Sequence, residues 1–364
     1  MQDTSPLPNL IAQNPYPDCL QLNLIPLSSN ADVPIELSLS LAFNEQWEPL
    51  LNGRVKFGIK GGTLHLDVPE GTVKNSAISQ TYSLSSPNSK TIFLNITDCG
   101  TAHLAWDFSV CKGEPFLKGT LDSLTLATLD LSNPSSHPTI TFTVESSDIY
   151  ITDTEGLWKP DLSPNKHAVL ERKLAQFLQQ TRLSPYLSTV CSPSQTPTPQ
   201  QKPENNSLEQ LIQQIETAQT DDLLELAAMA NLNPHQDFAG GNLLAVDCRG
   251  MDLSGSDFSR ANLRGANLSD ADLSEANLSG TRLSGVDLSG AYLENSNFND
   301  ADLHCASLAL ANLGGANLQG ANLVETNLSN TNLSYAKLEG AKLGKNSGLS
   351  EEMKHDLVQR GAKA

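Results

Sequence analysis

The chain has 364 residues, of which 38% are hydrophobic and 18% charged, and its formal net charge is −18. The acidic balance excludes nucleic-acid binding by phosphate neutralisation, because no cluster of Lys or Arg is present to release counterions. The N-terminus has no basic segment followed by an apolar one, and no run of about eighteen apolar residues occurs, so we expect neither a signal peptide nor a membrane span.

Residues 1–190 are predicted to form a β-rich domain that ends in a helix. Apolar residues alternate with polar or small ones along several segments, for example from Ile35 to Phe43 and from Ile140 to Val144. Short segments with a period of two are typical of an antiparallel β-sandwich or an open barrel. Residues 164–190 instead carry a helical apolar stripe. We expect this helix to pack on the sheet, and docking of a partner is the alternative.

A linker and a helical pair follow this domain. Residues 191–206 contain four Pro together with Gln, Ser and Thr but no large apolar residue, which predicts an extended linker. Ser207 and Gln210 form a capping-box pattern at the start of one helix, and Thr220 starts a second. We predict that residues 207–236 are a helical cap for the next domain, whose open end would expose unpaired backbone and apolar core.

Residues 237–347 contain an internal repeat of five residues. From Phe238 to Leu343 every fifth residue, the centre of a unit, is Leu or Phe, with Cys248 as the one exception. A small residue, usually Ala, stands two positions before most centres. A period of five matches neither a helix nor a strand. The repeat therefore predicts a coil with four sides per turn, in which the centre and the small residue point inward and residues twenty apart are stacked.

These units resemble the pentapeptide-repeat family. The segments 266–270 (ANLSD), 286–290 (VDLSG) and 316–320 (ANLQG) match nearly letter by letter its pattern of a small residue, Asn or Asp, Leu or Phe, Ser, Thr or Arg, and Gly. The resemblance implies a mainly β fold, a right-handed quadrilateral β-helix with short capping helices, here joined to an N-terminal β-sandwich-like domain. Residues 232–240 and 348–353 resemble the flanking segments of cyanobacterial members. We predict that residues 348–364 form a C-terminal capping helix.

The sequence contains no recognisable catalytic or metal-binding pattern. Its seven His lack the spacing of a zinc site, and we interpret His304 and Cys305 as a surface His beside an incidental Cys. A filled coil offers no pocket for reactants. We therefore predict no catalytic residue, no metal site, no cofactor and no enzymatic activity. The six Cys show no CxxC spacing, which favours free thiols in a cytoplasmic protein.

Binding of another protein is the function that remains. Outward positions of the coil hold apolar side chains, which are the candidate partner-binding residues: Leu244, Tyr292, Leu310, Val324 and Tyr335. Acidic residues gather on two adjoining faces, which are either a solvated surface or a candidate acidic face: Asp247, Asp252, Asp270, Asp272, Glu275, Asp287 and Glu294.

The sequence as a whole predicts a non-catalytic scaffold or adaptor for protein–protein interaction, with unidentified protein partners. The resemblance to cyanobacterial members implies a role in regulation or assembly in such a cell. Two alternatives remain open. One, also implied by the family, is an acidic, DNA-shaped rod that binds a type II topoisomerase. The other is a ligand-binding or enzymatic N-terminal domain. A homodimer formed through the amphipathic ends of the coil is an alternative to the capping role of those ends.

Overall fold

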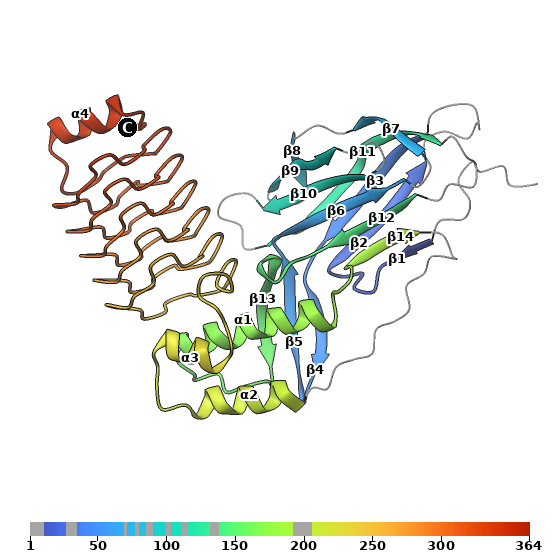
Figure 1. Cartoon of the computed structure of the whole chain (residues 1–364), viewed down its shortest axis with the longest axis horizontal. Coiled ribbons are helices and arrows are strands. Elements are labelled where there is room, and N and C mark those ends of the chain that lie inside the picture. The colour runs from blue at the N-terminus through green and yellow to red at the C-terminus, as the bar shows by residue number, and fades with distance from the viewer. Residues whose placement is uncertain are drawn as a thin grey trace, which may run out of the picture. The chain divides into compact units, whose positions relative to one another are not determined.

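The computed structural model describes residues 11–26, 35–68, 71–76, 80–84, 90–99, 103–110, 116–131, 138–191 and 206–364 (Figure 1). Contacts divide the chain into two compact units. The first comprises Met1–Thr154 and Phe177–Glu204, and the second comprises Glu155–Gln176 and Asn205–Ala364. Of the predicted linker, residues 192–205 lie outside the described residues, whereas Cys191 ends a strand and Asn206 begins a helix.

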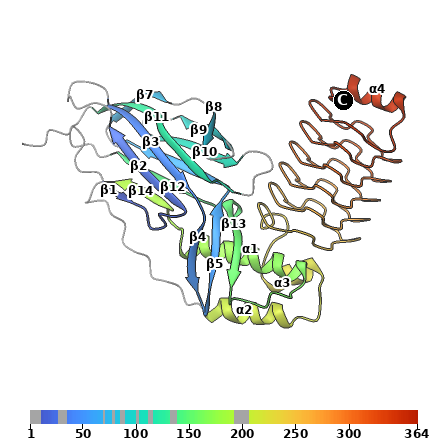
Figure 2. The same ribbon diagram turned by 180° about the vertical axis from the view of Figure 1, so that it is seen from behind.

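Three sheets form the first unit, and Figure 2 shows them from behind. The seven-stranded sheet has, in spatial order, β1 (Ile11–Gln13), β14 (Ser188–Cys191), β12 (Thr139–Thr143), β6 (Gly61–Asp67), β10 (His103–Val110), β9 (Lys90–Cys99) and β8 (Gln80–Leu84). The four-stranded sheet has β2 (Leu20–Pro26), β3 (Ile35–Phe43), β11 (Gly119–Leu131) and β7 (Gly71–Ser76). The three-stranded sheet has β13 (Ile149–Glu155), β5 (Gly53–Ile59) and β4 (Gln46–Leu50), and the short helix η1 (Ser146–Asp148) precedes β13.

The two larger sheets meet through aromatic side chains. Phe43 of β3 lies 6.4 Å from Phe108 of β10 and 6.2 Å from Phe142 of β12, measured between ring centroids. The buried face between these two sheets follows from the alternation in the sequence. Leu64 and Leu66 of β6, for example, are two residues apart and are both fully buried. The three-stranded sheet does not follow from that alternation. The alternation shifts phase between Ile59 of β5 and Leu64 of β6, but a phase shift alone does not show that the chain changes sheets at the residue between these strands.

Helix α1 (Pro164–Thr181) is shorter than the sequence predicts. The helix ends at Thr181 instead of continuing to residue 190, because Pro185 lacks the backbone N–H that a helix requires. The β-branched Thr189 and Val190 then lie in β14, which pairs with β1 and β12. Residues of α1 up to Gln176 belong to the second unit, whereas the sequence analysis placed the whole helix on the sheet of the first domain.

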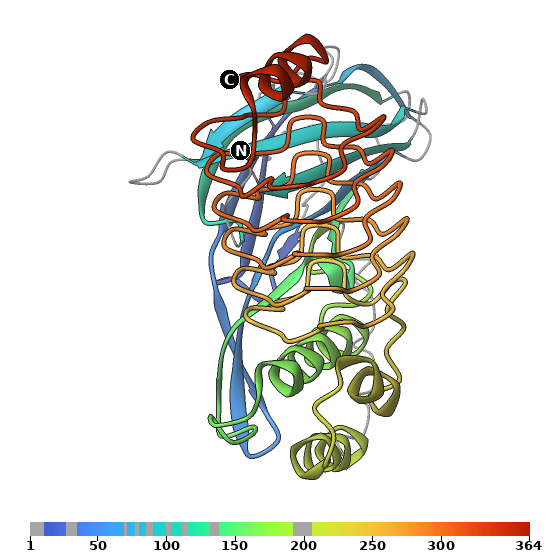
Figure 3. The same cartoon turned by 90° about the vertical axis from the view of Figure 1, so that its left-hand side faces the viewer.

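The second unit is built on the five-residue repeat. Parallel bridges join residues twenty apart, from the pair Asn242 and Asn262 to the pair Asn327 and Ser347, so four units complete one turn. Figure 3 shows the turns stacked on one another. Every centre from Phe238 to Leu343 is buried, with no more than 7% of its surface exposed. The predicted inward direction of the centres is therefore confirmed. We call residues 238–347 the repeat coil.

Small polar residues inside the repeat coil satisfy their own hydrogen bonds. The hydroxyl of Thr281 donates to the carbonyl of Phe258 at 2.8 Å, and that of Thr326 donates to Leu303 at 2.9 Å. A buried hydroxyl without a partner destabilises a fold by roughly 1–3 kcal/mol. The backbone carbonyls of the coil thus allow Ser and Thr to replace Ala at the small inward position.

Two helices lead into the repeat coil. Helix α2 (Asn206–Thr217) is followed by α3 (Leu223–Met229). The carboxylate of Asp222 caps α3 by accepting hydrogen bonds from the N–H groups of Leu224 and Glu225 at 2.9 and 3.0 Å. The helix therefore begins after Asp222, slightly later than the start predicted at Thr220, whose hydroxyl instead accepts from the N–H of Asp222.

The N-terminal part of α1 also covers the first turn of the coil, a contact that the sequence analysis did not predict. The amide of Asn165, which is 1% exposed, donates to the carbonyl of Asp247 at 2.8 Å and accepts from its N–H at 2.9 Å. This side chain thus replaces the lower turn that Asp247 lacks. The stem of the buried Arg172 packs on Gly241, where an added Cβ would lie 2.8 Å from Cδ of Arg172.

The C-terminal end of the coil is closed by helix α4 (Glu351–Gln359) and the residues after it. Lys363 bridges to Lys342 as an additional strand segment, and the N–H of Leu343 donates to its carbonyl at 2.6 Å. The guanidinium of Arg360 donates to the carbonyls of Leu333 and Ala336. Both backbone and side chains therefore satisfy polar groups that the last turn would otherwise leave open.

Candidate interaction surface

The surface of the repeat coil is ordered by ladders of side-chain amides. Asn277 donates to Asp257 at 3.1 Å, Asn297 donates to Asn277 at 3.2 Å, and Asn317 donates to Asn297 at 3.1 Å. Each of these residues lies twenty positions from the next, so the ladder runs along the stacking direction. Stacked amides of this kind restrain side chains that would otherwise be mobile on the surface. The coil therefore presents outward side chains from a well-fixed backbone.

Two of the five predicted apolar contacts lie on one side of the coil, and a third lies at the corner of that side. We define the Tyr292 face as residues 251–255, 271–275, 291–295, 311–315 and 331–335, which are stacked through bridges between residues twenty apart. Tyr292 is 57% exposed, and Tyr335, at the edge of the last unit, is 92% exposed. Leu310 is 68% exposed and ends the adjoining face, in the column of Asp270 and Gly290, at the corner before residue 311. The structure thus brings Tyr292 and Tyr335 to one face and Leu310 to the corner that this face shares with the adjoining one.

The spacing also places Tyr292 near Leu310. The N–H of Gly290 donates to the carbonyl of Ala309, and Tyr292 bridges to Asn312. Leu310 therefore lies one turn above Gly290 and diagonally across from Tyr292. Diagonal neighbours on adjacent strands are separated by about 7–8 Å between Cα atoms, a distance that aromatic and long side chains span.

The other two predicted contacts lie elsewhere on the coil. Leu244 and Val324 differ in number by a multiple of twenty, so both belong to one column, and this column is separate from the Tyr292 face. Leu244 is 47% exposed and Val324 is half-buried. These two residues are therefore not part of a common patch with the tyrosines.

The predicted acidic residues divide between two adjoining faces. Asp252, Asp272, Glu275 and Glu294 lie on the Tyr292 face, and Asp252, Asp272 and Tyr292 follow one another in a single column. Asp247, Asp270 and Asp287 lie on the adjoining face, where Asn267 separates Asp247 from Asp287. The carboxylates on that face form no unbroken stripe in the described coil.

Several of these carboxylates also fix the turns. Asp252, Asp272 and Asp287 each accept a hydrogen bond from the N–H of the Ser two residues later, at 3.1, 2.9 and 3.0 Å. Such bonds are typical of Asx turns. Hydrogen bonds from Ser254 lower the pKa of Asp252, and hydrogen bonds from Arg249 lower that of Asp247. The acids therefore have structural roles besides any contact with a partner.

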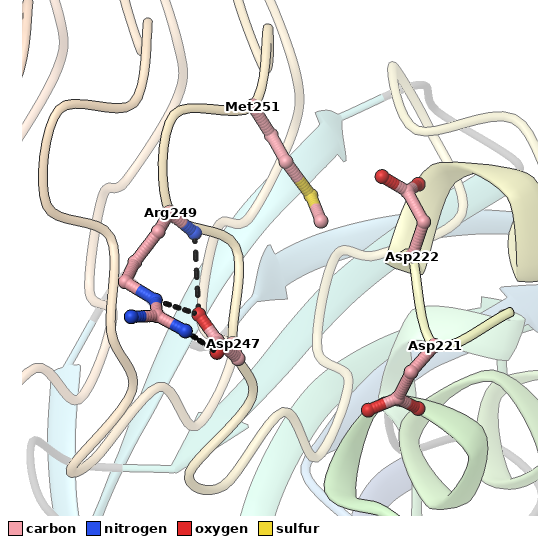
Figure 4. A pocket seen from close by; sticks show the side chains of 5 residues that line it. All are labelled: Asp221, Asp222, Asp247, Arg249 and Met251. Carbon is pink, nitrogen blue, oxygen red and sulfur yellow. Dashed lines mark hydrogen bonds and ion pairs between the residues drawn. The ribbon is translucent and has the colours of Figure 1, made fainter.

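A pocket of about 460 Å³ lies at the N-terminal end of the coil, and Figure 4 shows the side chains around it: Asp221, Asp222, Asp247, Arg249 and Met251. Each carboxylate already has a partner. Asp222 caps α3, Asp221 accepts from Ser163, and Asp247 pairs with the guanidinium of Arg249 at 2.8 Å. The pocket is therefore explained by the contacts that close the coil, and we assign no ligand to it.

A second cluster of polar side chains lies on the coil surface. His304, Cys305 and Glu325 place one nitrogen, one sulfur and one oxygen atom within 4.8 Å of each other. The sequence analysis singled out His304 and Cys305 but missed Glu325. The period itself contains the missing signal, because residue 325 lies twenty positions after residue 305 and is stacked above it.

The repeat pattern, its burial and its spacing of twenty residues agree with one family. The family model for pentapeptide repeats matches residues 242–280, 281–313 and 311–345. The chain belongs to the pentapeptide-repeat family. The matched residues begin and end close to the first and last residues of the repeat coil.

Solved structures of other pentapeptide-repeat proteins are similar to the coil. One from the thylakoid lumen of Arabidopsis thaliana is 32% identical, and the match covers 32% of this chain and 81% of that one, with a TM-score of 0.30. The protein alr5209 of Nostoc is 36% identical over 29% of this chain and 83% of its own, with a TM-score of 0.22. HetL of the same genus, which is involved in regulation of heterocyst differentiation, is 29% identical over 29% of this chain and 61% of its own, with a TM-score of 0.20.

No curated protein matched the chain. No helix in the described part of the chain has the length and apolar character needed to cross a bilayer.

Proposed function

We propose that this pentapeptide-repeat protein is a non-catalytic adaptor that binds a protein partner through the Tyr292 face. The proposal includes a right-handed quadrilateral β-helix as the form of the coil. The observation that carries it is the gathering of Tyr292, Leu310 and Tyr335, each more than half exposed, on one side and at the corner of that side of a coil whose backbone is held by hydrogen bonds between turns. Isolated exposed apolar residues are common on proteins, whereas contiguous exposed apolar surface marks interaction sites, and we propose that these three residues contribute to such a surface.

The backbone conformation of two of these residues follows the repeat. Leu310 and Tyr335 have positive φ angles of 62° and 61° at two different corners of the coil, where Gly290 and Gly315 stand one turn below, and the last residue of other units, such as Asp270 and Glu275, has the same conformation. A left-handed conformation costs about 1–2 kcal/mol for a residue with a Cβ. The coil thus carries two large apolar side chains in a position where Gly is less strained.

The chemistry of the face indicates the kind of partner. Its upper part offers tyrosine rings, which contribute strongly to binding energy at protein interfaces. Its lower part carries the carboxylates of Asp252, Asp272 and Glu275. A protein surface with an apolar centre and a basic margin complements this arrangement, since charges at the margin mainly raise the association rate.

Two further parts of the proposal rest on the cysteines and the acids. A cytoplasmic location is supported by Cys19, Cys191, Cys248 and Cys305, which are free thiols. A topoisomerase-binding DNA mimic is not favoured, because such a mimic needs closely spaced negative charge and Asn267 interrupts the column of Asp247 and Asp287.

Affinity purification with full-length chain tests the proposal. The double variant Tyr292→Ala with Leu310→Ser should lose the partner that the wild-type chain retains. The matched control is Leu244→Ser with Val324→Ala, which changes two apolar residues on a different column of the same coil. Retention of the partner by the first variant, or its loss from the control alone, would refute the Tyr292 face as the binding site.

A further inference from the structure

The side chains of His304, Cys305 and Glu325 offer more hydrogen-bond acceptors to one another than donors. The Nδ1 atom of His304 lies 2.9 Å from the carbonyl oxygen of Val324, and because a carbonyl can only accept, Nδ1 carries the proton. The Nε2 atom of His304 therefore has a free lone pair, which points to Sγ of Cys305 at 3.3 Å. The Oε2 atom of Glu325 lies 3.5 Å from the same sulfur. The single thiol proton of Cys305 can satisfy only one of these two acceptors at a time. A cation that displaces this proton can bind the sulfur, the nitrogen and the oxygen together.

The distances fit a small metal ion. We propose that His304, Cys305 and Glu325 bind one zinc ion on the surface of the repeat coil, through Nε2, Sγ and Oε2. In a tetrahedral zinc site, bond lengths of about 2.3 Å to sulfur and about 2.0–2.1 Å to nitrogen separate those two ligand atoms by about 3.5 Å. The separation of 3.3 Å between Sγ and Nε2 is close to that value before any metal binds. All three ligand atoms lie within 4.8 Å of each other, so small side-chain rotations complete the site.

Neighbouring groups hold the ligands in place. The hydrogen bond from Nδ1 to the carbonyl of Val324 orients the imidazole, as outer contacts do in most zinc sites with histidine. Lys345 pairs with Oε1 of Glu325 at 3.2 Å and leaves Oε2 for the metal. Both supports come from residues one turn away in the ladder, so the coil itself sets the geometry.

The ligand types select the ion. Thiolate and imidazole together favour zinc over magnesium or calcium, which prefer oxygen ligands. Cys305 and Glu325 are exposed, so the fourth position faces solvent and holds water. This proposal departs from the sequence-based expectation that His304 and Cys305 are an incidental pair.

Cobalt and zinc titrations of the full-length, chelator-treated chain test the site. Cobalt(II) chloride should produce a sulfur-to-cobalt charge-transfer absorption that saturates at one equivalent, and zinc chloride should remove it. Cys305→Ser should abolish this absorption, and Glu325→Gln should lower zinc affinity at least about tenfold, a loss comparable with that of a supporting contact.

The matched control is His235→Gln. Nδ1 of His235 also contacts a backbone carbonyl twenty residues later, that of Gly255 at 3.0 Å, so the control removes a similarly held imidazole elsewhere on the coil. It should leave cobalt absorption and zinc affinity unchanged. Absence of the absorption in the wild-type chain would overturn the proposal, as would its persistence in Cys305→Ser with unchanged zinc affinity. Circular dichroism of each variant checks that the fold is retained.

Discussion

The repeat coil and the sheets of the first unit are both rich in β structure, but their contacts differ in sequence separation. In the coil every bridge joins residues twenty apart, so the neighbours of a side chain follow from its number. In the first unit β1 pairs with β14, which places Ile11 opposite Cys191. The alternation within a strand does not indicate which distant strand it pairs with. The comparison teaches that regular spacing, and not β content, makes side-chain positions readable from sequence.

The strongest test of that spacing changes an inward centre. Leu288 is fully buried, and Leu288→Asp should lower the free energy of unfolding by about 4 kcal/mol or more, because a carboxylate in a dry interior has no partner. Ser334→Asp, at an exposed outward position, should change it by less than about 0.5 kcal/mol. Urea unfolding followed by circular dichroism measures both. Equal losses from the two variants would contradict the inward and outward assignment.

A second prediction concerns the end of the coil, where the regular spacing stops. Asn165→Ala should leave the backbone N–H and carbonyl of Asp247 without partners and destabilise the second unit by about 1–3 kcal/mol. Asn332→Ala is the matched control, because its exposed amide also bonds within the coil, to Asn312 at 2.8 Å, and water can replace it. A loss in the control as large as in Asn165→Ala would show that the cap is not special.

The smallest expected effect is a dependence of the cap on pH. Burial raises the pKa of Glu171 from its ordinary value of 4.5 to about 8, against an opposing hydrogen bond from Asn242. Between these values the folded chain binds a proton that the unfolded chain releases, so the free energy of unfolding should fall as pH rises from about 5 to about 8. Glu171→Gln should remove most of this fall.

Thermal unfolding of wild type and Glu171→Gln at pH 6 and pH 9 measures that effect. The variant should gain stability relative to wild type at the higher pH only. Parallel shifts of the two proteins would mean that Glu171 does not titrate in this range.

Much of the second unit was predictable from sequence. The period identified the inward centres, the family, the stacking of residues twenty apart and the exposure of Tyr292, Leu310 and Tyr335. The metal-binding candidate was not predicted: the sequence analysis interpreted His304 and Cys305 as an incidental pair and missed Glu325, because finding it requires the spacing of twenty to be applied to side chains of different types.

The contacts of α1 could not be predicted. Asn165 lies 82 residues before Asp247, and no sequence pattern near either residue indicates that the two are in contact. The three-stranded sheet of the first unit could not be predicted for the same reason, since β13 pairs with β5, which precedes it by many residues. Such contacts depend on tertiary packing and leave no periodic signal.

Hydrogen–deuterium exchange of the chain with its captured partner tests the central claim most directly. On partner binding, protection should appear in residues 291–295, 310–315 and 331–335, which carry the exposed apolar side chains of the Tyr292 face and its corner, and not in the column of Leu244 and Val324. Protection confined to that other column, or to the sheets of the first unit, would contradict binding through the Tyr292 face.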